Sequence, residues 1–77
     1  MRKKVNKHAN VFKDIKKNLV RGDLDLIYVE ASKQDASITS AQVYHAFQGN
    51  NVKEENLAII LRTARKIERK RIKEYAQ

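Results

Sequence analysis

Helix-breaking residues are nearly absent from this chain of 77 residues, which contains no proline and only two glycines, Gly22 and Gly49. Proline and glycine interrupt helices more strongly than any other residues, so the three segments that the two glycines separate favour helix formation. Apolar residues in those segments recur in steps of three and four, the spacing of one helix face. The pattern predicts an all-α fold of four helices at about residues 8–21, 24–33, 40–48 and 52–75, the last of them elongated.

The first two helices are predicted to meet at Gly22. Gly22 suits the left-handed position that follows a helix end, and Asp23 suits the cap of the next helix. The segment LDLIYV after Asp23 could also form a strand, because Ile, Tyr and Val favour strands. No other segment alternates in the way a partner strand would, so we expect a helix there. The polar segment SKQDAS (32–37) is predicted to connect this helix to the third one.

The start of the third helix carries two independent signals. Thr39 and Gln42 have the spacing of a capping box, in which each side chain bonds the backbone of the other residue. Ile38 and Val43 have the spacing of a hydrophobic staple around the same start. The helical period then predicts an inward face of Val43, Ala46 and Phe47. The outward face is predicted to contain Ser40, Ala41, Tyr44, His45 and Gln48.

The charge of the chain is concentrated at its two ends. The formal net charge of +8 divides into +7 for residues 1–21, −3 for residues 22–52 and +4 for residues 53–77. Basic ends around a nearly neutral centre favour a polyanion as partner, and nucleic acid is the commonest one. We expect one domain at residues 8–67, preceded by a flexible basic arm (1–7) and followed by a basic helical extension (68–77).

The order of these helices is typical of a helix-turn-helix domain. The segment Val43–Lys66 resembles the end of the DNA-binding headpiece of the lactose-repressor family, which reads V-S-R-V-L-N-G, a short turn, and V-S-E-E-T-R before an apolar helix. Val43, Phe47, Gln48 and Gly49 match the V, L, N and G of the first run. Val52, Glu54 and Glu55 match the V and E-E of the second, and Thr39 takes the cap position usually filled by Ser.

Three features depart from that family: the longer connection at 32–37, the absence of an effector-binding domain, and the additional helix and arm that precede the unit. Because of these departures, the expected relation is to the broader class of small phage or mobile-element regulators rather than to the lactose-repressor family itself. The resemblance implies duplex DNA as the partner and a third helix that faces base edges. Gln42 could be committed either to the helix cap or to a base. The residues expected to read bases are Ser40, Ala41, Gln42, Tyr44, His45 and Gln48.

The third helix carries no Lys or Arg, so phosphate contacts must come from other segments. We expect them from Lys3, Lys4, Lys7, Lys16, Lys17, Lys53 and Arg62. A dimer could form through the C-terminal helix, whose last turns extend beyond what so small a core can cover.

Other function classes find little support in the residues. The chain has no Cys, and its two His are far apart, so no metal site is expected. No catalytic motif, cofactor, small-molecule effector or membrane span is expected, and the expected location is the cytoplasm, with the nucleoid. The remaining alternative is a basic helical structural or protein-interaction module, for example of a virion, with only non-specific contact to nucleic acid.

Overall fold

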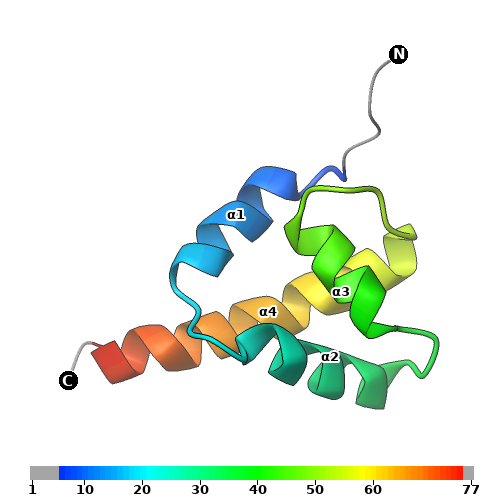
Figure 1. Cartoon of the computed structure of the whole chain (residues 1–77). Helices are drawn as coiled ribbons and strands as arrows, with labels where there is room; N and C mark the ends of the chain where they lie inside the picture. The colour runs from blue at the N-terminus through cyan, green and yellow to red at the C-terminus, as the bar shows by residue number, and fades with distance from the viewer. Residues whose placement is uncertain (1–5, 76–77) are drawn as a thin grey trace.

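A computed structural model describes residues 6–75 of the chain and contains four α-helices (Figure 1). They are α1 (Ala9–Lys17), α2 (Asp23–Gln34), α3 (Ser40–Phe47) and α4 (Glu54–Tyr75). No β-strand occurs within residues 6–75. The predicted all-α fold with an elongated C-terminal helix is confirmed, and LDLIYV is helical.

One apolar core joins the four helices. Phe12 of α1 and Phe47 of α3 meet edge to face at its centre, with ring centroids 4.9 Å apart. Both α3 and α2 also pack on α4, which runs across the back of the molecule in Figure 1. The inward face predicted for the third helix is confirmed, because Val43, Ala46 and Phe47 are all buried. The buried apolar residues are Phe12, Ile15, Ile27, Ala31, Ile38, Val43, Ala46, Phe47, Leu57, Ile60, Ala64 and Ile67.

The junction between α1 and α2 differs from the prediction. Helix α1 ends at Lys17, four residues before the predicted end at 21, and Gly22 is the N-cap of α2 with φ +90°. Asp23 is the first residue of α2 and not its cap. The reason is that the Asp23 carboxylate is buried beneath the turn, where it accepts a hydrogen bond from the Val20 N–H at 2.9 Å.

The C-terminal half of α4 is attached to this same turn. Arg71 donates to the two carboxylate oxygens of Asp23, from Nη2 at 2.7 Å and from Nε at 3.0 Å, and it also bonds Glu74. The Asp23 side chain is 3% exposed and the Arg71 side chain 23%. Helix α4 has 22 residues and is therefore about 33 Å long. The contact with Asp23 attaches the fifth turn of α4 to the α1–α2 turn, and the end of α4 extends beyond the other helices (Figure 1).

The start of the described chain is also fixed. Asn6 is 3% exposed, and its backbone N–H donates to the Gly49 carbonyl at 3.1 Å. Its side-chain amide donates to the carbonyls of Ala46 (3.1 Å) and Asn50 (2.9 Å). The flexible arm predicted for residues 1–7 therefore cannot extend to Asn6, and residues 1–5 lie outside the described part. No helix within residues 6–75 is long and apolar enough to span a membrane.

Candidate nucleic-acid interface

The capped start of α3 is present as predicted. The Thr39 hydroxyl accepts from the Gln42 N–H at 3.2 Å, and the Gln42 side-chain carbonyl accepts from the Thr39 N–H at 3.4 Å. Ile38 and Val43, the two residues of the predicted staple, are 2% and 0% exposed. Because these local contacts satisfy backbone donors at the first turn, they fix where α3 begins relative to the core.

The connection between α2 and α3 is shorter than the predicted segment 32–37, because α2 continues to Gln34. It forms without glycine because the Asp35 carboxylate accepts from the Ser37 N–H at 2.9 Å and from the Ser37 hydroxyl at 2.8 Å. These bonds lower the pKa of Asp35, the backbone bond most. The Ile38 N–H then donates to the Asp35 carbonyl at 3.1 Å and closes the turn. Residues 23–47 thus form a helix, a turn and a second helix.

Five of the six predicted base-reading residues share one exposed surface, which we call the α3 face: Ser40, Ala41, Tyr44, His45 and Gln48. The sixth, Gln42, lies on another side of the helix and is partly buried. Its carbonyl oxygen accepts from Asn56 of α4 at 3.0 Å as well as from the Thr39 backbone. An amide oxygen has two lone pairs, so both are used within the protein. In the free protein, Gln42 is therefore part of the helix cap.

Polar contacts hold the middle and the C-terminal end of the α3 face. Tyr44 is 41% exposed, and its hydroxyl donates to Asp25 of α2 at 3.1 Å. This hydrogen bond to a carboxylate raises the pKa of Tyr44. At the C-terminal end of the face, the Asn50 side-chain amide lies 3.4 Å from His45 Nδ1 and donates to the Gln48 side chain at 3.3 Å. The side chains of Tyr44, His45 and Gln48 are therefore oriented by contacts with neighbouring segments.

Basic side chains of α1 lie along the α3 face. One surface depression contains Lys16, Arg21 and Tyr44, together with Asp25. A second contains Lys7, Lys13 and Gln48. The face is neutral in itself, and α1 places exposed lysines beside its middle, at Tyr44, and beside its C-terminal end, at Gln48. Lys16 and Lys7 were predicted as phosphate contacts, whereas Lys13 and Arg21 were not. The three-residue spacing of Lys13 and Lys16 on one helix could have indicated the former.

The other predicted phosphate contacts lie in different surroundings. Lys17 is 3.7 Å from Asp14, Lys53 is 3.5 Å from Glu55, and Lys7 is paired with Glu54. These pairs are exposed and therefore weak, so the lysines can exchange partners. Arg62 lines a groove between α2 and α4 whose lining includes no residue of α3. Lys3 and Lys4 lie outside the described residues.

Comparisons with protein-family models, with curated proteins and with solved structures give no match. Within residues 6–75, no three His, Asp or Glu side chains gather as a metal site would require. The geometry of the α3 face and its surrounding charges is therefore the basis for a functional proposal.

Proposed function

We propose that this protein binds duplex DNA through a helix-turn-helix unit formed by α2 and α3, and that it acts as a transcriptional regulator or DNA accessory factor in the cytoplasm. The observation that carries the proposal is the neutral, polar α3 face with α1 lysines beside its middle and its C-terminal end. A short helix with small and polar residues at its start can enter the major groove, which admits one α-helix. Cations beside that helix can bond the phosphates that border the groove.

Each part of the face has a chemical role in this proposal. Ser40 can bond either type of base, and the Ala41 methyl group can contact the thymine methyl. Gln48 can bond adenine through its carboxamide, because its side chain is exposed at the end of the helix. Lys13 and Lys16 supply sequence-independent affinity. With no Arg or Lys on α3 itself, base discrimination should be modest, and the position of the protein on DNA should depend strongly on α1.

Affinity would increase if two copies bound adjacent half-sites. Ile72 and Tyr75 of α4 are 46% and 60% exposed, and they form the apolar surface nearest the C-terminal end of α4. A dimer through these residues would present two α3 faces, and linked sites bind more tightly than single ones. The size of the complex on DNA, measured by sedimentation velocity, distinguishes one copy per site from two.

The direct test is selection of a binding site from a random duplex pool, followed by the same selection with the double variant His45→Ala, Gln48→Ala. We expect the protein to enrich a short motif and the variant to lose preference at some positions of it. Control variants at Lys53 and Arg62, each changed to Ala, should enrich the motif of the unmodified protein. Enrichment of no motif, or of one motif by all variants, would contradict sequence reading by α3.

A further inference from the structure

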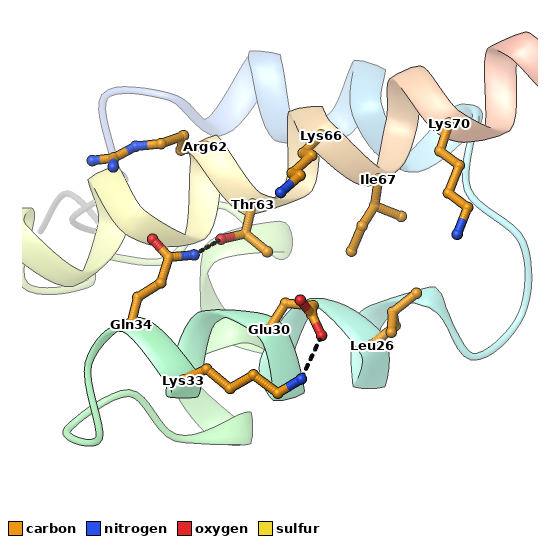
Figure 2. Close-up of a pocket in the computed structure, with 9 residues that line it drawn as sticks. All are labelled: Leu26, Glu30, Lys33, Gln34, Arg62, Thr63, Lys66, Ile67 and Lys70. Atoms are coloured by element: carbon orange, nitrogen blue, oxygen red, sulfur yellow. Dashed lines mark hydrogen bonds and ion pairs between the residues drawn. The ribbon is translucent and has the colours of Figure 1, made fainter.

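A groove on a different part of the surface separates α2 from α4 (Figure 2). We call it the α2–α4 groove. Its α2 side is formed by Leu26, Glu30, Lys33 and Gln34, and its α4 side by Arg62, Thr63, Lys66, Ile67 and Lys70. None of these residues belongs to the α3 face, and only Arg62 was expected to contact DNA. The proposed DNA contact therefore leaves this groove without a function.

The groove has an apolar strip beneath a basic rim. Figure 2 shows Leu26 on α2 opposite Ile67 on α4, and both aliphatic side chains line the groove, with Ile67 at its floor and only 6% exposed. Leu26 is 37% exposed, and Val29, on the same helix, is 44% exposed. The other end is crossed by a hydrogen bond of 3.1 Å from the Gln34 amide to the Thr63 hydroxyl. Apolar surface that remains exposed beside a groove is a common feature of protein-binding sites.

The charge of the rim is strongly one-sided. Four cations line the groove, Lys33, Arg62, Lys66 and Lys70, against the single carboxylate of Glu30. That carboxylate is itself paired with Lys33 at 3.1 Å. Lys66, Arg69, Lys70 and Lys73 continue the positive surface along α4 around Ile72. A ligand of this groove must therefore carry negative charge in addition to an apolar face.

We infer that the α2–α4 groove binds an acidic amphipathic helix of a partner protein. The lining on α4 extends over nine residues from Arg62 to Lys70, a length of about 12 Å at a rise of 1.5 Å per residue. That length holds about two turns of a helix, whose apolar positions would contact Leu26 and Ile67 while acidic positions meet the lysines. A second copy of this chain would place two basic rims against each other, which is unfavourable. Duplex DNA would use the cations but would leave the apolar strip without a contact.

The test uses synthetic helical peptides and the full-length chain. The probe is a fluorescein-labelled peptide of about 14 residues, or four turns, with Leu on one face and Glu on the others. Two matched peptides replace either every Glu by Lys or every Leu by Ser. Anisotropy titrations measure binding to the unmodified protein, to the double variant Lys66→Glu, Lys70→Glu, and to the double variant Lys13→Glu, Lys16→Glu. All four lysines are exposed, and both variants have the same net charge.

The expected result is saturable binding of the Leu/Glu peptide and at least fivefold weaker binding of each matched peptide, as a rough scale. The Lys66/Lys70 variant should weaken that binding by about tenfold, and the Lys13/Lys16 variant by less than about threefold. Amide chemical-shift changes on adding the peptide should centre on Leu26, Thr63 and Ile67. This inference does not depend on DNA binding, and the peptide titrations test it independently of the proposed function.

Several results would overturn it. Equal weakening by both double variants would show only general charge attraction, and binding of none of the peptides would exclude an acidic helix as the occupant. If the unliganded protein self-associates and the Lys66/Lys70 variant does not, the groove is an interface between copies of this chain. If duplex DNA causes the shift changes at Leu26 and Ile67 and displaces the peptide, the groove is part of a nucleic-acid site.

Discussion

At the residue scale, the most consequential side chain of the fold is Asp23. Its buried carboxylate bonds the backbone of the α1–α2 turn and the guanidinium of Arg71, which follows 48 residues later. The side-chain bond from Arg71 holds the pKa of Asp23 below its ordinary value, against an opposing effect of burial. Because the pKa is lower in the folded state than in the unfolded chain, ionised Asp23 stabilises the fold.

This contribution has a defined pH dependence. It is fully present above the unfolded pKa of about 3.9 and is lost as the pH falls through the lower folded value. We expect Asp23→Asn to reduce the free energy of unfolding by about 2 kcal/mol near pH 7. The difference between the variant and the unmodified protein should shrink as the pH falls below the unfolded pKa. Urea denaturation at several pH values measures it.

The control for this prediction is Asp14→Asn. Asp14 is an exposed carboxylate 3.7 Å from Lys17, and pairs of this kind contribute little to stability. A loss of stability at Asp14 as large as that at Asp23, or an Asp23 effect that does not depend on pH, would contradict the role given to the buried ion pair.

At the element scale, the start of α3 could be predicted from the sequence while the end of α1 could not. The capping box and staple act within six residues, from Ile38 to Val43, so their spacing is visible in the sequence. The turn after α1 is held by contacts of Asn18 with Glu68 and of Asp23 with Arg71, pairs that are far apart in the sequence and meet only in the folded chain. Sequence spacing alone therefore predicted Asp23 as a helix cap. In the structure its carboxylate is instead committed to the buried ion pair with Arg71.

The distinction between local spacing and long-range contacts also explains which residues of the candidate site could be predicted. The exposed side chains of α3 follow from the helical period, and the α3 face matches that expectation. The second hydrogen bond of Gln42 comes from Asn56, and the position of α1 depends on the bonds of Asn6 to the turn after α3. These contacts join distant segments. For that reason the sequence could not indicate that Arg21 would lie near Tyr44, or that Arg62 would lie in a different groove.

The capping box gives an element-scale prediction. Thr39→Ala removes the side-chain acceptor of the Gln42 N–H, which should lower the free energy of unfolding by about 1 kcal/mol. Ser40→Ala is the matched control, because Ser40 is exposed at the next position, and it should change stability by less than about 0.5 kcal/mol. Chemical denaturation measures both. Equal effects of the two substitutions would mean that the cap does not contribute to the stability of α3.

At the scale of the whole molecule, the basic residues divide into two surfaces. Lys13, Lys16 and Arg21 lie beside the α3 face, whereas Lys66 and Lys70 line the α2–α4 groove. The net charge of +8 attracts any polyanion, so affinity for DNA by itself would not identify the contact surface. Two variants of equal net charge, one changed beside the α3 face and one in the α2–α4 groove, can distinguish binding at a specific surface from general charge attraction.

The central claim is therefore tested most directly by the affinity of these two double variants for one duplex at constant salt. Lys13→Glu, Lys16→Glu should weaken binding at least about tenfold, because it removes phosphate contacts beside the α3 face. Lys66→Glu, Lys70→Glu should weaken it less than about threefold, through net charge alone. Equal losses in the two variants, or a larger loss in the second, would contradict DNA binding through α1 and α3.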